Sequence, residues 1–483
     1  MLKLNKLAIV LAATFSATTA FAAPVTPTDI QNASTLNQAW ITGASAPTLN
    51  VFLGFAAGCE ANTLAMFHGG TADVANPGAS NTGNAFAYAC KRGGVVSVLY
   101  HTNQGGSFNA YAPHVPNNVA GTGFGVTTNL NRLANVAKAS CSNVGSITSL
   151  TPVTPTQPEN PVPNQPAVPV YKCSNAVING FTATDNTPKK PAGGFSDVEA
   201  ALFGVDASSY GTELDAGVTQ VFGVMASQPL YRAMQVAQRI YASEADAIAA
   251  DPSFLPQNAP SISKEQYASL ASDPLATWAP LGVDDSKEVI IARRVNTSGT
   301  QGSSNAFFMG NPCLGNPSTS SVLFPTTAAD SDPGFYNVVE GGETAEVRTA
   351  ISNASTAGKF AIGVVSLENT DAAGRRYLKV EGVHPAAGPN NTTDDKARYT
   401  SAQGQYPFQI ELKAFVANDA KGTFGETAIN QIISGVSSVQ CNIVPRGLVL
   451  NSASSACSSA NSGIHITRTT RNGNNCRPLT WKF

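Results

Sequence analysis

The most constraining feature of this sequence is a repeated order of β-rich run, small-residue turn and helix-like segment. Runs rich in β-branched and apolar residues occupy 95–101, 218–224, 288–295 and 360–367, and weaker ones occupy 377–383 and 408–416. Three helices are predicted, one directly after Ser227 and two others at 344–355 and 424–434. Residues 384–407 are polar and rich in Gly and Asn, which predicts a long loop. Repeated strand–turn–helix units indicate an α/β fold with mostly parallel strands.

The first 22 residues are typical of a cleavable signal peptide. Lys3 and Lys6 precede a short apolar run at 7–15, and Ala20-Phe21-Ala22 offers small residues at a cleavage site. The run is too short to cross a bilayer, and no later window reaches about 18 uninterrupted apolar residues. We therefore expect signal-peptide residues 1–22, a periplasmic or secreted mature chain, and no membrane-spanning segment.

Composition limits the class of function. Only 12% of residues are charged and the formal net charge is −2, so no strong positive field favours nucleic acid. With 42% apolar and 8% aromatic residues, the chain is also too apolar to be generally disordered.

Eight cysteines, all beyond residue 22, fit an exported chain with disulfide bonds. None is in a C-x-x-C motif, so zinc and thiol-redox sites are disfavoured, and we expect no metal and no cofactor. Pairing of neighbours in the sequence favours Cys59–Cys90, Cys141–Cys173 and Cys457–Cys476, which leaves Cys313–Cys441.

Residues 151–170 contain seven prolines, four of them at every third position, as in a polyproline II segment. Such a segment buries little, so we expect an exposed arm whose deletion changes stability little. We place it in an insertion at 141–173, and we expect an irregular, disulfide-tied extension at 441–483.

Three turns of small residues follow predicted strands and precede predicted helices. They are Gly43-Ala44-Ser45, Gly105-Gly106-Ser107 and Ser298-Gly299-Thr300. Small residues let backbone N–H groups approach an anion, and Ser and Thr hydroxyls add donors. One such turn alone is more often a plain helix cap, but three of them, with Arg294 nearby, indicate an oxyanion site.

Several of these segments resemble the periplasmic phosphate-binding proteins, the solute receptors of phosphate ABC transporters. Residues 294–300 (RVNTSGT) are similar to the family's R-x-D-x-S-G-T signature, 43–47 (GASAP) to its first-turn motif, and 194–197 (GFSD) to its Gly-x-Ser-Asp segment. The resemblance implies a type 2 periplasmic-binding-protein architecture at 23–440, with two lobes joined by hinge strands and a second lobe at about 220–380. It further implies phosphate or a related oxyanion as ligand, ABC-type uptake with a permease as partner, and no enzymatic activity.

The resemblance also implies the ligand-binding residues, which are Ser45, Ser107, Ser196, Asp197, Arg294, Ser298, Gly299 and Thr300. The Ser and Thr residues would donate hydrogen bonds, Asp197 would accept a proton of the ligand, and Arg294 would supply the cation. A plain helix cap at 196–197 is the competing interpretation. Asn296 stands where the family has an Asp that braces the arginine, and Arg293 adds a second cation.

Two other classes of function stay open. One is a secreted surface-interaction or adhesive protein, which the proline arm and the tail would suit. The other is a phosphatase on the same scaffold, although we identify no catalytic residue and no nucleophile motif. His101 ends a predicted strand beside the second turn, where a structural role is the simpler interpretation.

Overall fold

The computed structural model describes residues 23–70, 85–103, 105–116, 140–148, 165, 167–174, 190–251, 255–314, 322–438, 444–452 and 466–482. The expected signal peptide, residues 151–164 of the proline arm, and Cys441 and Cys457 lie outside these described residues.

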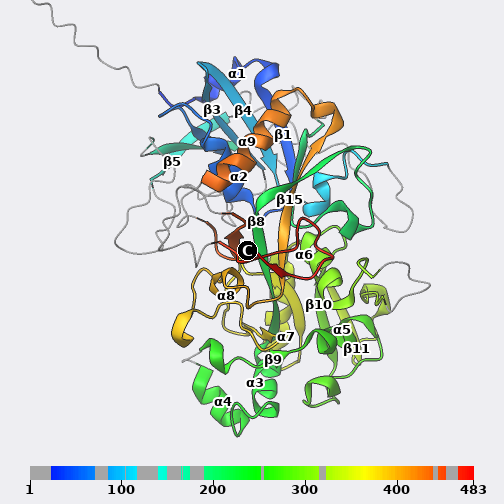
Figure 1. The fold of residues 1–483 in the computed structure, drawn as a ribbon. Coiled ribbons are helices and arrows are strands. Elements are labelled where there is room, and N and C mark those ends of the chain that lie inside the picture. Colours follow the sequence, from blue (N-terminus) through cyan, green and yellow to red (C-terminus); the bar gives the residue numbers. More distant parts are fainter. Residues whose placement is uncertain are drawn as a thin grey trace, which may run out of the picture.

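The described chain is a mixed α/β structure around one large sheet of 14 strands (Figure 1). The sheet has the order β11-β10-β12-β8-β15-β7-β1-β4-β3-β2-β6-β5, and β13 and β16 also pair with β8. Its strands are β1 (Gln38–Gly43), β2 (Ala65–His68), β3 (Ala85–Arg92), β4 (Val95–Thr102), β5 (Ser140–Ile147), β6 (Val168–Ser174), β7 (Gly193–Ser196), β8 (Gly211–Ser227), β10 (Val289–Arg294), β11 (Tyr336–Gly341), β12 (Ile362–Ser366), β13 (Arg375–Tyr377), β15 (Gln409–Ala417) and β16 (Leu448–Leu450).

The described residues also form two small sheets and nine α-helices, besides several short 3-10 turns and a π-helical turn. The small sheets pair β9 (Ser261–Ile262) with β14 (Lys379–Val380), and β17 (Thr469–Thr470) with β18 (Thr480–Trp481). The helices are α1 (Pro27–Gln31), α2 (Thr48–Ala56), α3 (Gln228–Ala237), α4 (Glu244–Ala250), α5 (Lys264–Ser272), α6 (Gly299–Ser304), α7 (Thr344–Thr356), α8 (Tyr399–Ala402) and α9 (Phe424–Ser438).

Strands β8 and β15 run through the middle of the molecule (Figure 1). β8 begins opposite the end of β15, where Gly211 pairs with Ala417, and it ends beside β12, where Ala226 pairs with Ile362. We call β1–β7 with α1, α2 and α9 the upper half, and β9–β14 with α3, α4, α5 and α7 the lower half, after their places in Figure 1. The two central strands therefore join the halves through backbone hydrogen bonds.

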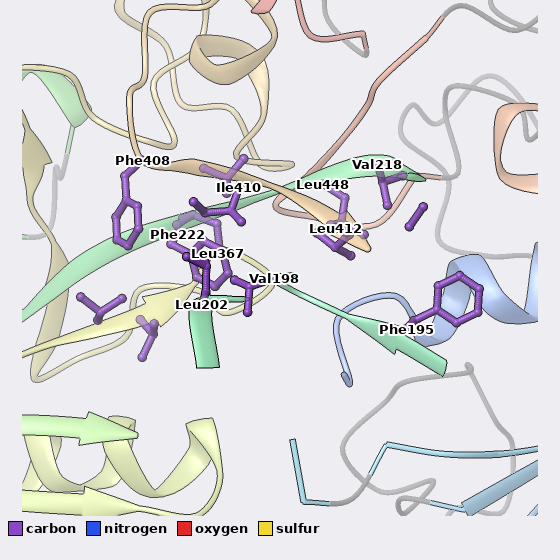
Figure 2. Packing of buried hydrophobic residues seen from close by; sticks show 14 of the residues in the cluster. Phe195, Val198, Leu202, Val218, Phe222, Leu367, Phe408, Ile410, Leu412 and Leu448 are labelled. Atoms are coloured by element: carbon purple, nitrogen blue, oxygen red, sulfur yellow. The ribbon is translucent and has the colours of Figure 1, made fainter. Parts of the chain in front are cut away.

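The hydrophobic core continues along these central strands. All nine residues of β15 are buried, and so is every residue of β8 from Val218 to Ser227. Figure 2 shows the packed side chains along this seam: Phe195, Val198, Leu202, Val218, Phe222, Leu367, Phe408, Ile410, Leu412 and Leu448. Such a continuous apolar seam stabilises the central strands against separation.

The expectation of mostly parallel strands is wrong. Parallel pairing holds for β1 with β4 and β7, for β10 with β11 and β12, and for β2 with β6, but β8 and β15 pair antiparallel with their neighbours. β3 and β4 form an antiparallel hairpin whose turn, Gly93-Gly94, has φ values of 58° and 78°. Glycine tolerates this left-handed backbone, so the chain reverses within two residues.

Most of the strands and helices expected from the sequence are confirmed, including β4, β8, β10, β12, β15, α3, α7 and α9. The run at 377–383 is different, because it holds the end of β13 and the short β14 instead of one strand. Glu381 and Gly382 have φ values of 51° and 78°, which turn the chain and end β14. The region expected to be a long loop contains the one-turn helix α8.

Two of the four expected disulfides are confirmed, Cys59–Cys90 and Cys141–Cys173. The other two are wrong, because Cys313 is bonded to Cys476 across 163 residues of sequence. The C-terminal segment 466–482 returns to the middle of the molecule, where Lys413 Nζ donates to the Gly473 carbonyl at 2.6 Å (Figure 1). The pairing of cysteines that are close in the sequence therefore failed to predict the bond between Cys313 and Cys476.

The end of the proline-rich segment packs on the upper half, contrary to the expectation of a wholly exposed arm. Val168 and Val170 are fully buried in β6. Gln165 is 2% exposed, accepts from the Leu64 N–H at 2.9 Å and donates to the Leu64 carbonyl at 2.7 Å. Gln165 and residues 168–170 therefore belong to the sheet and its edge.

A deletion that includes residues 165–170 should thus change the stability more than one that stops at residue 164. Removing 151–170 deletes two buried valines and the Gln165 contacts, so we expect the free energy of unfolding to fall by about 3–6 kcal/mol. Removing only 151–164 shortens a connection and should change it by about 0.6 kcal/mol or less. Urea denaturation of both variants and the intact chain measures the difference. Equal stability of the two deletions would contradict the packing described here.

Candidate functional site

Two sets of three parallel strands direct their carboxyl ends to one place. In the upper half β1 runs parallel to β4 and β7, and in the lower half β10 runs parallel to β11 and β12. In open α/β sheets, ligands bind outside the carboxyl ends of the strands, where the strand order reverses. A ligand site is therefore expected where these six ends meet.

A small cavity lies at this place. Its volume is about 20 Å³, which is room for about one water molecule. Its lining comes from the upper half (Ala44, Ser45, Ala46, Gly106, Ser107 and Asp197) and from the lower half with α6 (Arg294, Ser298, Thr300, Thr344, Ser366 and Glu368). Every one of these residues follows, or ends, one of the converging strands or begins the next helix.

Arg294, the last residue of β10, is the cation of this cavity. It is 8% exposed, and its guanidinium donates to Thr344 Oγ1 at 2.7 Å and to the Gly342 carbonyl at 2.8 Å. Burial lowers the pKa of Arg294, but an arginine stays charged at neutral pH. Its Nε has no hydrogen-bond partner, and within the described residues it forms no salt bridge. Neutral partners thus fix a buried positive charge without neutralising it.

Arg293 points to the other face of β10, as alternation along a strand requires. It is 3% exposed and donates to the carbonyls of Thr326 and Arg294 and to the side chain of Asn296. Asn296 therefore braces Arg293 and not Arg294, whose bracing falls to Thr344 and Gly342. The second cation is a structural residue.

Asp197 places a carboxyl group against the same cavity. It is 7% exposed, its Oδ2 accepts from the Ser107 hydroxyl at 2.9 Å, and its Oδ1 has no hydrogen-bond partner among the described residues. Burial raises its pKa from 3.8 to about 6, although the Ser107 hydrogen bond and the charge of Arg294 oppose this. A carboxyl group that titrates near neutral pH is suited to exchange a proton with a bound ligand.

Direct contacts between the upper half and α6 close the cavity. The Gly299 N–H donates to Ser107 Oγ at 3.1 Å, and the Phe108 N–H donates to the Thr297 carbonyl at 3.1 Å. A Cβ at Gly299 would lie 2.4 Å from Ser107 Oγ, and one at Gly106, whose φ is 85°, would lie 2.9 Å from the Thr297 carbonyl oxygen. Only glycine permits this close approach.

Most of the predicted site residues meet here. Six of the eight line the cavity: Ser45, Ser107, Asp197, Arg294, Ser298 and Thr300. Ser45 is exposed, so it lies at the rim. Gly299 contributes through its N–H contact with Ser107. Ser196 does not line the cavity, because its hydroxyl donates to the Val198 carbonyl at 2.6 Å.

Two competing interpretations of single residues can be judged from the geometry. Asp197 is not a helix cap, because the next helical turn begins at Ala200 with Glu199 as its N-cap. His101 does not line the cavity and is buried, with its ring near Phe86 and Tyr88. The histidine is therefore part of the core.

Sequence reasoning missed Thr344, Ser366 and Glu368. Ser366 ends β12 and Glu368 follows two residues later, so both stand at the carboxyl end of a strand that had been expected at 360–367. The rule that ligands bind at strand ends would have indicated them. Burial, followed by the nearby charge of Asp197, raises the pKa of Glu368 from 4.5 to about 7.

Comparisons with known proteins gave matches of low similarity among solved structures. No protein-family model matches the sequence, and no curated protein matches it. Among solved structures, one described as a phosphate ABC transporter substrate-binding protein from Clostridium perfringens, with bound phosphate, is 11% identical with a TM-score of 0.30, over 49% of this chain and 71% of that one. An ABC-type phosphate transport receptor from Vibrio cholerae is 12% identical with a TM-score of 0.30, over 50% of this chain and 72% of that one.

Two features are absent from the described residues. They contain no group of three or more His, Cys, Asp or Glu side chains arranged to hold a metal ion. Within the same part of the chain, no helix combines the length and the apolar character that crossing a membrane requires.

The raised pKa of Asp197 predicts a pH-dependent cost to stability. A folded-state pKa of about 6 against 3.8 means that stability is lost as pH rises from about 4 to about 6, because the unfolded chain ionises first. Asp197→Asn removes this cost, so its gain in unfolding free energy over the unaltered protein should grow to about 1–3 kcal/mol at neutral pH.

Urea denaturation of the anion-free protein at about pH 4.5 and about pH 7.5 measures this gain. Asp206→Asn is the matched control, since Asp206 is exposed and its pKa is lowered by Ser208. A gain that is equal at both pH values would show that Asp197 is not the group that titrates.

Proposed function

We propose that this protein is an exported solute-binding protein that holds phosphate or a related oxyanion in the cavity around Arg294. The observation that carries the proposal is the pairing of two incompletely satisfied buried groups, the Arg294 guanidinium and the Asp197 carboxyl, across one polar cavity. A buried polar atom without a partner is costly, so a ligand that supplies both partners would be bound strongly.

The chemistry of the lining fits a protonated oxyanion better than other ligands. Arg294 attracts the negative charge, and the hydroxyls of Ser298 and Thr300 line the cavity as hydrogen-bond donors, while the Ser107 hydroxyl donates to Asp197. Ser298 precedes α6, and its side chain does not cap that helix. Asp197 would accept a ligand O–H, which a hydrogenphosphate has and a sulfate lacks.

Ligand access in this proposal requires the two halves to move apart. A tetrahedral oxyanion is larger than the one water molecule for which a cavity of about 20 Å³ has room. The halves touch at the site through Ser107 and Gly299 and through Phe108 and Thr297, while β8 and β15 run through both halves. We propose that the halves act as two lobes and that β8 and β15 are the hinge.

The proposed cellular role is ABC-type uptake from the periplasm or the exterior, with a transporter permease as partner. It rests on the signal-peptide pattern at 1–22 and on the resemblance of residues 43–47, 194–197 and 294–300 to phosphate-receptor motifs. In this role the protein binds its ligand without altering it and has no enzymatic activity.

The proposal predicts that substitutions of the two neighbouring arginines change different properties of the protein, one its affinity for phosphate and the other its stability. Arg294→Ala should weaken binding of inorganic phosphate by about 2–5 kcal/mol, or roughly 30-fold to several thousand-fold, because the charge-assisted contact is lost. Arg294→Lys should recover only part, since an ammonium group cannot reproduce the planar contacts with Thr344 and Gly342.

Arg293→Ala is the matched control. It should lower the melting temperature, because Thr326 and Asn296 lose a buried partner, while phosphate affinity stays within about threefold in the folded protein. Titration calorimetry with phosphate, arsenate, sulfate and molybdate, together with thermal denaturation, measures both effects. Absence of binding by all four anions to the unaltered protein would overturn the receptor proposal and favour the surface-interaction alternative.

A further inference from the structure

We propose that Glu368 is a second specificity-determining carboxyl group of this cavity, which acts with Asp197 to select an oxyanion that carries acidic hydrogen atoms over one that is fully ionised. The inference rests on the proposed function and deepens it, because it concerns which chemical form of the ligand the same site accepts. None of the motifs that resemble phosphate receptors includes Glu368, which lies in a different part of the chain.

The position of Glu368 is fixed by the fold. β12 ends at Ser366 and runs parallel to β10, so Glu368 lies at the same sheet edge as Arg294 and lines the same cavity. The Ser366 hydroxyl donates to Glu368 Oε1 at 3.1 Å. Asn369 holds this turn in place, because its amide donates to the Ser366 carbonyl at 3.0 Å and its Oδ1 accepts from Arg348 at 2.6 Å.

The charges around Glu368 do not balance when both carboxyl groups are ionised. Glu368 lines the cavity together with Asp197 and Arg294, and the charge of Arg348 on α7 also acts on it. Within the described residues it forms no salt bridge with either arginine, and Ser366 alone donates a hydrogen bond to it. Glu343 and Glu346 at the start of α7 add negative charge near Arg294. The cavity lining itself then holds one cation and two anions.

An added anion would be repelled unless protons separate it from the carboxylates. A ligand O–H that donates to Asp197 or Glu368 replaces repulsion by a charge-assisted hydrogen bond. Alternatively, protonated Glu368 donates to a ligand oxygen, which its pKa of about 7 allows near neutral pH. Either arrangement accepts phosphate or arsenate with acidic hydrogens. Sulfate suits neither arrangement equally well, because it has no hydrogen to donate to the ionised Asp197 and, in the first arrangement, none to donate to Glu368.

Two measurable consequences follow. Affinity for inorganic phosphate should fall as pH rises from about 6 to about 8.5, because Glu368 and the ligand both lose protons in that range. Glu368→Gln removes the charge with little change in shape. This variant should show a shallower fall, and its preference for phosphate over sulfate should narrow by roughly tenfold at neutral pH.

The experiment is titration calorimetry of the full mature protein with inorganic phosphate and with sulfate across this pH range. Glu368→Asp keeps the charge and should retain the steep pH dependence and the selectivity at reduced affinity, which a merely structural role would not produce. Glu244→Gln, an exposed residue of α4, is the matched control and should behave as the unaltered protein.

The outcomes separate the two proposals. If the unaltered protein binds phosphate and Glu368→Gln leaves both the pH profile and the phosphate-to-sulfate ratio unchanged, the role of Glu368 is overturned while the receptor function stands. If the unaltered protein binds neither anion, the receptor function fails, and the role of Glu368 that rests on it fails too. A narrowed ratio with a shallower pH profile supports the inference.

Discussion

The antiparallel pairing of β8 with β15 determines where the rest of the central sheet lies. β15 carries the upper half, because it also pairs with β7, and β8 carries the lower half, because it also pairs with β12. Because β8 and β15 are paired, the parallel strands β1, β4 and β7 meet the parallel strands β10, β11 and β12 at their carboxyl ends. The buried seam of Phe222, Phe408 and Ile410 stabilises this arrangement, so the position of the cavity depends on a part of the core that contains none of its lining residues (Figure 2).

Charge balance is the second constraint, and it acts where the strand ends meet. A buried arginine held by neutral partners and two buried or half-buried carboxyl groups with raised pKa values are unfavourable for stability when no ligand is present. Proteins commonly retain such groups at sites of function, where a ligand that supplies the missing hydrogen-bond partners offsets their cost. Arg293 is the contrast, because Thr326 and Asn296 satisfy a guanidinium that the cavity does not use.

Much of the fold and of the site was predictable from local sequence patterns. Runs of β-branched residues identified β4, β10 and β12, and turns of small residues identified where Ser107 and Ser298 come together. These features depend on neighbours in the sequence, which is why they can be recognised without the structure. The motif segments also predicted correctly which of two adjacent arginines faces the cavity.

The failures concern long-range contacts. Nothing near Cys313 indicates Cys476 as its partner, and Gln165 looks like part of a polyproline arm until Leu64 is placed beside it. Strand direction was misjudged because β8 and β15 find their neighbours through tertiary packing. Glu368 was missed for a different reason. It lies in none of the recognised motifs, and only the rule that ligands bind at strand ends would have indicated it.

The central claim is that an oxyanion binds between Arg294 and Asp197, and crystallography with arsenate tests it most directly. Arsenic scatters anomalously, so an anomalous-difference map locates the anion without reference to its chemistry. The account predicts one strong peak at the carboxyl ends of β7 and β10, with oxygen atoms within hydrogen-bond distance of the Arg294 guanidinium and the Ser298 hydroxyl. A saturated crystal with no peak there, or with peaks only at other surfaces, would contradict it.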